Sequence, residues 1–413
     1  MLHPDFIKPD YQGHCFSQIP QTIQHLLTGN GALPFAETLF KDLEPRYNTV
    51  ILFLVDAFGW HFFERYRDRY PFFNHFEDTG RVARLDAQFP STTACHVTTI
   101  HTGLPVGQSM VFDWQYYEPQ LDAIIVPLLY SFAGSRKRET IRTTGLKPEA
   151  LIPTRTLYRD LKQNGVQSHV FQHQAFTPSP FGSVVFQGAT VHPYRTLAEG
   201  LTNMAAAVHS SSAPAYIFFY FSPIDDICHH YGPDSPQFEA EVDAFFTTLE
   251  SLFFNKIARN LKNTLFMLTA DHGQTPVDPA TTLYLNLDPT FTGLEKYIRT
   301  DRQGRLIIPG GSCRNMILYL KEGVLEEAQA LLSAGLAGRA EVYTVSEMIA
   351  AGLFGDVPVI PEFIERAGDL WILPFRNESV WWYEKGRFEQ LFYGHHGGLT
   401  PEEIRIPLLI HPF

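Results

Sequence analysis

The sequence predicts an α/β protein with a doubly wound, mostly parallel sheet, helices on both faces of the sheet, and a smaller α+β insertion. Two observations predict this fold class. Short runs rich in β-branched and aromatic residues occupy positions 49–55, 168–171, 215–221 and 264–269. These runs are mostly apolar rather than alternating, which is typical of strands covered on both faces of a parallel sheet. Stretches with helical spacing separate them, and this alternation indicates βαβ units.

Three of the stretches between these runs are predicted as helices. Residues 154–164 are followed by Gly165, and glycine commonly ends a helix because it adopts a left-handed backbone conformation. Residues 194–209 and 237–261 place apolar side chains at helical spacing.

The part of the chain from 279 to 390 has a different pattern. Its four predicted strands are at 314–320, 340–345, 369–374 and 380–383, and its one predicted helix is at 324–332. We therefore expect a core made of residues 1–278 and 391–413, interrupted by an α+β insertion at 279–390. A second, smaller insertion is expected at about 113–153.

Composition excludes some classes of protein. Hydrophobic residues make up 45% of the 413 residues and charged residues 18%, which is ordinary for a globular protein. The 32 Lys and Arg against 44 Asp and Glu give a formal net charge of −12. An acidic surface disfavours a long nucleic acid partner, whereas a small phosphorylated substrate stays compatible because bound cations invert the local field.

The cysteines and the chain start bear on location. The four cysteines share no CxxC spacing and do not form a disulfide framework. The first residues, MLHPDFIKPDYQGHCF, lack the basic and apolar regions of a secretory signal. No apolar run has the length of a membrane span. We expect a cytoplasmic protein with reduced thiols and no membrane partner; the oligomeric state is not predicted.

Acidic and histidine side chains follow three of the predicted strands directly. Asp56 closes the first strand, Asp225 follows 215–221, and Asp271 follows 264–269. Because functional sites of open α/β sheets gather at the carboxyl ends of the strands, we expect these groups to meet in space.

The neighbours of these carboxylates supply imidazoles. His272 comes after Asp271, and Gly273 permits the turn that brings both onto one ion. Asp225 and His229 are four residues apart and would share one side of a helical turn. Asp226 and His230 have the same spacing, so spacing alone leaves the register open.

A fourth group lies near the C-terminus, in the sequence GHHGG, where His395 and His396 compete for the same role. Asp oxygens and His nitrogens are ligands that zinc takes in catalytic sites. Two such metals a few ångströms apart clamp the attacking and leaving oxygens of a phosphoryl group.

The segment FPSTTACHVTTIHTG offers a hydroxyl nucleophile. Ser91, Thr92 and Thr93 precede a helix-like run that ends at Gly103. One of these hydroxyls is expected to cap the helix, and another to bind a metal and attack phosphorus. His96 lies on the helix, where a packing role is the favoured interpretation.

Together these segments resemble the alkaline phosphatase superfamily, and within it the type I phosphodiesterase and nucleotide pyrophosphatase branch. The matching segments are VDAFGW, FPSTTACHVTTIHTGLP, SPIDDICHHYGPDS, TADHGQ and HHGG. They occur in the family's order and cover the chain from about residue 48 to the C-terminus.

The resemblance implies an alkaline phosphatase-like fold and a role for each residue. Thr93 matches the nucleophile, which forms a phosphothreonine intermediate and also binds metal. Asp56, Asp271 and His272 match the ligands of the activating metal. Asp225, His229 and His396 match those of the second metal; the Tyr-Gly-Pro that follows favours this register over Asp226 and His230. Two Zn²⁺ are expected, with Mn²⁺ as an alternative.

Two departures from the family pattern concern the substrate. Nucleotide-cleaving members commonly carry an Asn beyond the T-G-L, where this chain has Asp113 and Trp114. Cys228 replaces a glycine before the metal-binding His229. Phe58, Trp114 and Arg314 are the candidates for substrate contacts, although each aromatic residue is also compatible with a core position.

The predicted activity is hydrolysis of phosphodiester or pyrophosphate bonds, with nucleotides as substrates. No arginine adjoins Thr93 in sequence, which favours a singly charged diester over a monoester. The alternatives are a phosphomonoesterase, phosphonate hydrolase or phosphomutase of the same superfamily, or a non-catalytic protein that binds a phosphorylated ligand.

Overall fold

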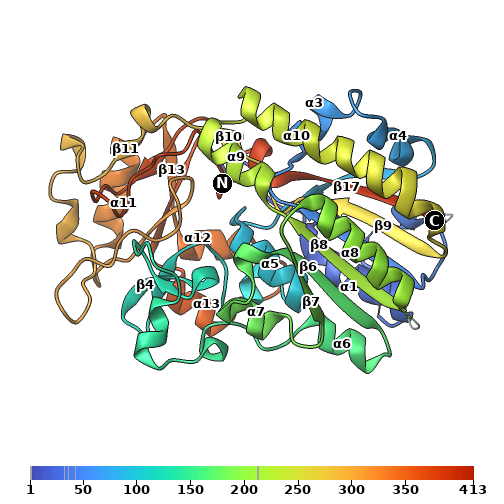
Figure 1. The fold of residues 1–413 in the computed structure, drawn as a ribbon. Coiled ribbons are helices and arrows are strands. Elements are labelled where there is room, and N and C mark those ends of the chain that lie inside the picture. The colour runs from blue at the N-terminus through green and yellow to red at the C-terminus, as the bar shows by residue number, and fades with distance from the viewer. Residues whose placement is uncertain (1, 32, 36, 42, 212–213) are drawn as a thin grey trace.

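A seven-stranded sheet runs through the protein in the computed structural model, which describes residues 2–31, 33–35, 37–41, 43–211 and 214–413 (Figure 1). The strand order is β2-β17-β9-β1-β8-β6-β7. The strands are β1 (Thr49–Val55), β2 (Arg81–Asp86), β6 (Gln167–His173), β7 (Thr190–Tyr194), β8 (Ala215–Phe221), β9 (Thr264–Thr269) and β17 (Arg405–Pro412).

Most neighbouring strands of this sheet are parallel, as predicted. β9, β1, β8, β6 and β7 run in one direction. β17 is antiparallel to both β9 and β2, and the sequence did not predict these two strands or β7. The predicted bounds of β1, β8 and β9 are confirmed, because each is an uninterrupted apolar run buried along its whole length.

Helices cover both faces of the sheet, which confirms the predicted fold class. On one face α1 (Ile19–Thr28) packs against β1 and β8, together with α5 (Thr93–Thr102) and α6 (Leu157–Gln163). On the other face α8 (Leu197–Ser210) packs against β6 and β8 and contacts α10 (Pro236–Thr248). α10 continues as a π-helical segment, Leu249–Ile257, so the helix predicted at 237–261 is present. Further helices are α2 (Glu37–Phe40), α3 (Trp60–Tyr66), α4 (Pro71–Asp78) and α7 (Pro180–Val185).

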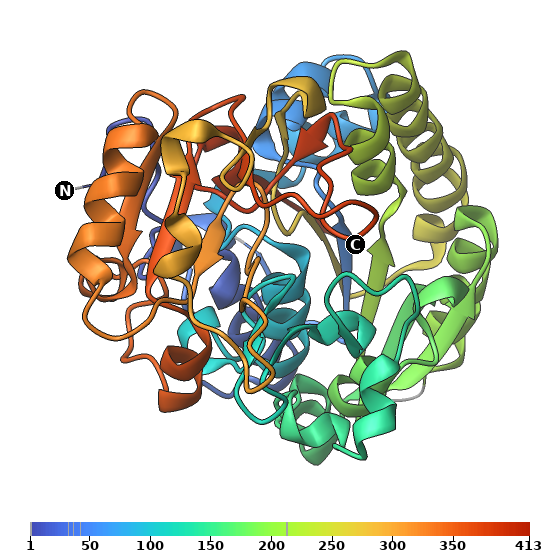
Figure 2. The ribbon, with the colours of Figure 1, turned by 90° about the vertical axis from the view of Figure 1, so that its left-hand side faces the viewer.

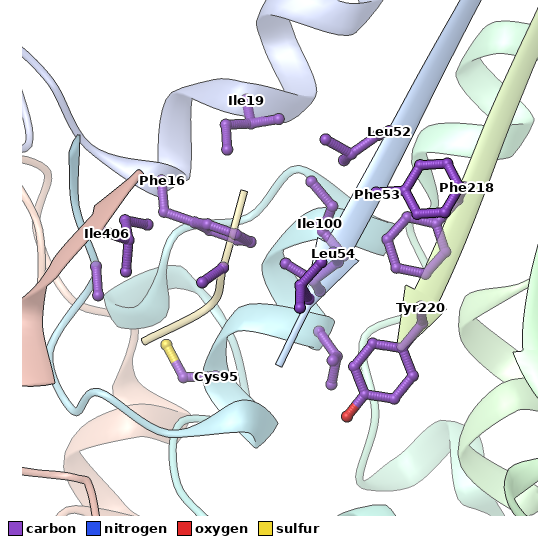
Figure 3. Packing of buried hydrophobic residues seen from close by; sticks show 14 of the residues in the cluster. Phe16, Ile19, Leu52, Phe53, Leu54, Cys95, Ile100, Phe218, Tyr220 and Ile406 are labelled. Atoms are coloured by element: carbon purple, nitrogen blue, oxygen red, sulfur yellow. The ribbon is translucent and has the colours of Figure 1, made fainter. Parts of the chain in front are cut away.

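The central strand β1 joins the two layers through its alternating side chains. Phe53 stacks on Phe219 at 4.6 Å and lies 5.2 Å from Phe266, between ring centroids. Figure 3 shows Leu52 and Leu54 among Ile19 and Ile100, which belong to the α1 and α5 layer. The residue after the strand, Asp56, is thereby anchored by a fully buried segment.

The chain from 279 to 390 builds a second layer beside the end of the sheet, orange in Figures 1 and 2. Its strands form an antiparallel sheet in the order β12-β14-β13 and a parallel pair, β11 with β15. The elements are β11 (Leu283–Tyr284), β12 (Met316–Leu318), α11 (Leu325–Gly335), β13 (Ala340–Thr344), α12 (Val345–Ala350), α13 (Pro361–Arg366), β14 (Leu370–Pro374) and β15 (Val380–Trp381). A separate apolar cluster, from Leu283 to Trp382, lies inside the predicted insertion. The division of the chain into these two parts stays a prediction.

The segment after α5 forms a small antiparallel sheet at the place of the second expected insertion. Its strands are β3 (Tyr116–Glu118), β4 (Ala123–Val126) and β5 (Ser131–Phe132). All four cysteines lie in described parts of the chain, and each is free and buried. Among the described helices, none is both long and apolar enough to cross a membrane.

His101 of α5 makes the stability of the fold depend on pH. It is buried between Phe186 and Phe218, its Nδ1 lies 2.7 Å from the Tyr158 hydroxyl, and burial lowers its pKa to about 3. The unfolded chain binds a proton at this residue below about pH 6.5, whereas the folded chain stays unprotonated down to about pH 3. The stability that the neutral imidazole contributes is therefore present above pH 6.5 and is lost as the pH falls.

We predict that His101→Gln flattens the slope of unfolding free energy against pH between pH 6.5 and 4. The slope should fall by up to about 1.4 kcal/mol per pH unit, the effect of one proton. Urea unfolding at pH 7, 6, 5 and 4 measures it, with the exposed His209→Gln as the surface control. An unchanged slope in His101→Gln would contradict the assignment.

Candidate active site

Four of the predicted ligands gather at the carboxyl ends of three adjacent parallel strands. Asp56 follows β1, and Asp271 with His272 follows β9. Asp225 lies in the first turn of α9 (Pro223–Tyr231), which follows β8. Since β8, β1 and β9 are neighbours in that order, the three chain ends emerge side by side at one edge of the sheet.

Asp56, Asp271 and His272 form the first group of potential metal ligands. Their ligand atoms lie within 4.8 Å of one another, and all three residues are buried. His272 Nε2 is 3.6 Å from Asp56 Oδ1 and 3.3 Å from Asp271 Oδ2. These two carboxylate oxygens have no hydrogen-bond partner.

The other oxygen of each carboxylate is held by the protein. Asp271 Oδ1 accepts hydrogen bonds from the N–H of Ala57 at 3.1 Å and of His272 at 3.0 Å. The Tyr220 hydroxyl donates to Asp56 Oδ2. Figure 3 shows Tyr220 at the edge of the apolar cluster, with its hydroxyl directed away from the other side chains. Each carboxylate is thus fixed through one oxygen and presents the second to a shared point.

The electrostatics of this group fit a divalent cation. Burial raises the pKa of Asp56 well above its usual value, and the Asp271 and Asp225 carboxylates raise it further. Burial also raises the pKa of Asp271, and it lowers the pKa of His272 to about 4. Two buried carboxylates therefore meet beside a neutral imidazole, and a bound cation would offset their charge.

Asp225, His229 and His396 form the second group, in which Asp225 lies near both imidazoles. Asp225 Oδ1 lies 3.4 Å from His229 Nε2 and 3.8 Å from His396 Nε2. The ligand atoms of Asp225, His272 and His396 all lie within 4.8 Å of one another. The rings of His272 and His396 stack with their centroids 3.7 Å apart, so the two groups of potential ligands are in direct contact.

Each of the three imidazoles is oriented by a backbone carbonyl. Nδ1 lies 3.1 Å from Gly273 O in His272, 2.8 Å from Gly394 O in His229, and 2.8 Å from Ser91 O in His396. A donor proton on Nδ1 leaves Nε2 unprotonated, which is the form that binds metal. This arrangement is the usual support of a histidine ligand.

Thr93 is the one of the three candidate hydroxyls that faces the cluster. It is the first residue of α5, and its Oγ1 lies 3.1 Å from His272 Nε2. Thr92 occupies the N-cap position, but its hydroxyl makes no capping hydrogen bond. Ser91 Oγ instead donates to Gly398 O at 2.8 Å and accepts from Gly397 N at 3.1 Å.

The competing histidines lie outside the cluster. Asp226 and His230 pair with each other at 3.6 Å, with side chains 72% and 56% exposed, so the register beginning at Asp225 is the one that enters the site. His395 Nδ1 accepts a hydrogen bond from the N–H of His396. His96 uses both ring nitrogens on the backbone of Gln88 and Thr92, which supports its packing role.

Two glycines let the ligand loops approach each other. A Cβ at Gly59 would lie 2.7 Å from Gly273 Cα, and a Cβ at Gly273 would lie 2.1 Å from Glu402 O. Both distances are shorter than side-chain atoms tolerate. Between the first aspartate and Gly59, Ala57 has a φ of 62°, a strained conformation for alanine that aims its N–H at Asp271.

His396 reaches the site through a short strand pair. β16 (Gly394–His395) is antiparallel to β10 (Thr275–Pro276), which directly follows the Asp271 loop. Gln274, next to β10, donates to Asp225 Oδ1 at 2.6 Å. Sequence reasoning missed Gln274 and Tyr220, because one resembles a loop residue and the other a core strand residue.

A cleft of about 680 Å³ opens beside Thr93, Asp56 and Asp225. The residues that line it also include Trp114, which is 41% exposed, and Phe176. A hollow of about 750 Å³ at the opposite end of the sheet, beside Asn48 and Thr264, is lined by none of the predicted ligands.

Two of the three predicted substrate residues do not reach this cleft. Phe58 is fully buried and packs against Phe246 at 4.9 Å, because the turn at Ala57 sends it into the core. Arg314 is fully buried in an ion pair with Glu403. Both predictions are therefore corrected, whereas Trp114 stays a candidate.

The doubly wound sheet, with an Asp–His cluster beside a helix-borne hydroxyl at the carboxyl ends of its strands, places the protein among α/β proteins with a candidate metal site. Within this class the chain belongs to the type I phosphodiesterase / nucleotide pyrophosphatase family, whose model matches residues 50–399. Membership of this family supports phosphodiester hydrolysis. No curated protein sequence matches the chain.

Solved structures share the fold. Murine ectonucleotide pyrophosphatase / phosphodiesterase 5 (ENPP5, NPP5) has a TM-score of 0.65 and 17% sequence identity, over 88% of this chain and 87% of that chain. An inactive variant of the murine protein in complex with AMP also has a TM-score of 0.65 and 17% sequence identity, over 88% of this chain and 87% of that chain. Human ENPP5 has a TM-score of 0.60, with 17% identity and coverage of 88% and 87%.

The repulsion between the two buried carboxylates gives a prediction. Asp271→Asn keeps the oxygen that accepts the N–H of Ala57 but removes one charge. The free energy of unfolding of the metal-free protein should therefore rise by roughly 1 kcal/mol or more. Its melting temperature in chelator should rise by about 2 °C. We expect added zinc to raise the melting temperature of the wild type and to leave that of Asp271→Asn unchanged.

Asp226→Asn is the control, because this neighbouring carboxylate is exposed and outside the cluster. Its response to zinc should equal that of the wild type. A metal-free Asp271→Asn protein less stable than the wild type, or one that zinc still stabilises fully, would contradict the interpretation.

Proposed function

We propose that this protein hydrolyses phosphodiester or pyrophosphate bonds of nucleotides, with Thr93 as nucleophile and two divalent metal ions as cofactors. Zinc suits the Asp and His ligands, and manganese is the alternative. The observation that carries the proposal is the position of Thr93 Oγ1, 3.1 Å from His272 Nε2, where the two ligand groups meet beside the cleft.

The residues suited to holding the metals are those of the two ligand groups. Asp56, Asp271 and His272 would hold one ion, and Asp225, His229 and His396 the other. When bound, such ions lower the pKa of a nearby hydroxyl and offset charge on a phosphoryl group. The two unpartnered carboxylate oxygens support this assignment, because the protein supplies no donor to them.

In the proposed reaction Thr93 Oγ1 attacks phosphorus in line while its hydroxyl proton passes to solvent, and the leaving oxygen takes up a proton from solvent as it departs. The bond from phosphorus to the leaving oxygen breaks, and a phosphothreonine forms. Water then attacks the same phosphorus, the bond to Thr93 Oγ1 breaks, and the hydroxyl is restored. The phosphoryl oxygens would lie at the N-terminus of α5, whose free N–H groups favour negative charge.

The charge of the cleft favours a diester over a monoester. Among the described residues that line it, Arg138 is the one with a fixed positive charge, and Asp226 and Glu139 add negative charge. A diester carries one negative charge at neutral pH, so it requires fewer cations than a monoester. The complex of the murine relative with AMP, and the aromatic wall at Trp114, support a nucleotide as substrate.

The function is tested with the zinc-loaded wild type on bis(p-nitrophenyl) phosphate, the p-nitrophenyl ester of TMP, a dinucleoside polyphosphate and p-nitrophenyl phosphate. We expect turnover of the diesters or the polyphosphate to exceed turnover of the monoester. Preference for the monoester would overturn the diesterase assignment. Bound zinc without turnover of any substrate would indicate a binding protein instead.

Thr93→Ala should lower kcat on the preferred substrate by at least about a thousandfold, because it removes the attacking atom. Zinc content and melting temperature should stay close to those of the wild type. Thr92→Ala is the matched control: its hydroxyl is adjacent but makes no hydrogen bond, so activity should change little. Wild-type turnover in Thr93→Ala would remove Thr93 from the mechanism.

Trp114→Ala tests whether the aromatic wall binds the nucleoside. Stacking of a base on an aromatic side chain contributes about 1–3 kcal/mol, so kcat/KM for the p-nitrophenyl ester of TMP should fall about tenfold or more. Methyl p-nitrophenyl phosphate has the same leaving group and no base, and its kcat/KM should change less than about twofold. Equal losses on both substrates would exclude a nucleoside contact at Trp114.

A further inference from the structure

A fully buried ion pair joins the insertion to the C-terminal end of the core. Arg314 Nε donates to Glu403 Oε1 at 3.0 Å, and Nη2 donates to Oε2 at 2.8 Å. Arg314 Nη1 donates to the carbonyls of Phe375 and Glu378. Both side chains of the pair are 0% exposed. Burying two charges costs desolvation energy that their attraction only partly offsets, so stability alone is a weak reason for such a pair.

Glu403 is in contact with the loop that carries His396. Its Oε1 accepts the N–H of Gly398 at 2.9 Å. Its Oε2 accepts the N–H of Thr400 at 3.2 Å and the Thr400 hydroxyl at 2.7 Å, at the start of α14 (Pro401–Ile404). The carboxylate that Arg314 fixes is therefore the support of the turn directly after the ligand.

The same turn is bonded to the nucleophile segment. Ser91 Oγ binds both Gly397 N and Gly398 O, and the Ser91 carbonyl accepts from His396 Nδ1 at 2.8 Å. Ser91 is two residues before Thr93. A shift of the turn would move the His396 ring relative to the attacking hydroxyl.

Glu403 also contacts the loop of the first ligand group. Its carbonyl accepts the N–H of Gly273 at 3.0 Å. Gly273 follows His272, and the carbonyl of Glu402 leaves no room for a side chain at that glycine. Glu403 thus contacts the loops of both ligand groups, and Arg314 fixes the position of its carboxylate.

We infer that Arg314 is a positioning residue of the metal centre, supplied by the insertion, which acts through Glu403 on the loops that carry His396 and His272. The inference rests on the proposed function, because it assumes that these loops bind metal. It assigns the insertion a part in building the site. The neighbouring Ser312 supports this role, since its Oγ lies 3.3 Å from the His396 carbonyl.

The chain contains a matched control pair. Arg366 Nε donates to Glu118 Oε2 at 2.8 Å, and their side chains are 3% and 1% exposed. Arg366 also donates to Glu362 O, and Glu118 also accepts from Gln120 N. These partners lie in α13 and beside β3, outside the ligand loops, so this pair has the same chemistry and burial without the contact to the site.

The test compares Arg314→Met, Glu403→Gln and Arg366→Met in the full chain. Each protein is freed of metal with a chelator and titrated with zinc, and its melting temperature is measured without metal. We expect Arg314→Met and Glu403→Gln to lower zinc affinity by about tenfold to a hundredfold, as loss of a residue behind a metal ligand does. The zinc affinity of Arg366→Met should stay within about twofold of that of the wild type, even if its melting temperature falls.

Glu403→Gln keeps an oxygen for Gly398 and serves as the milder variant if Arg314→Met does not fold. Wild-type zinc affinity in Arg314→Met, or in Glu403→Gln where only that variant folds, would overturn the inference. An equal loss in Arg366→Met would also overturn it, because the effect would then follow from any buried pair. A wild-type chain that binds neither zinc nor manganese would overturn the proposed function and the inference together.

Discussion

The meeting of Asp56 and Asp271 at one buried point is the constraint on which the rest of the site depends. Their strands, β1 and β9, are hydrogen-bonded neighbours, so the two carboxylates emerge side by side. Burial of ionised carboxylates costs several kcal/mol unless partners offset it. Backbone N–H groups donate to one oxygen of Asp271, and the Tyr220 hydroxyl donates to one oxygen of Asp56. The second oxygen of each carboxylate has no hydrogen-bond partner. The fold thus concentrates two carboxyl groups whose ionised forms the protein itself does not neutralise.

The surrounding structure keeps this arrangement rigid. The close approach of Gly59 and Gly273 locks the two ligand loops together, and the left-handed Ala57 aims its N–H at Asp271. The three imidazoles are each fixed by a carbonyl. A site in which ligands are held by backbone groups reorganises little when a cation binds, because the order is already present in the fold.

The sequence predicted the central strands and the ligand groups because both signals are local. An apolar run bounded by polar residues identifies a buried strand, and an aspartate directly after it lies at the sheet edge. β17 and β2 escaped prediction: β17 contains Pro407 and Pro412, and the side chains of the edge strand β2 are mostly only half-buried. The ion pair of Arg314 could not be predicted, because its partner Glu403 is 89 residues away. Phe58 was misassigned because the direction of a side chain after a turn depends on backbone geometry rather than on residue type.

The departure from the family pattern at Asp113 and Trp114 now has a structural meaning. Asp113 is fully buried, accepts hydrogen bonds from Asn315 Nδ2 and Trp114 N, and has a pKa that burial raises to about 8. Asp113 therefore contacts the insertion through Asn315. The next residue, Trp114, lines the cleft with an exposed aromatic face. In place of the Asn expected from the family pattern, this chain has a buried carboxyl group followed by an exposed aromatic ring, which fits the proposed stacking of a nucleoside on Trp114. The predicted ligand groups match the family pattern while positions 113 and 114 depart from it, and the two lie on separate segments of the chain.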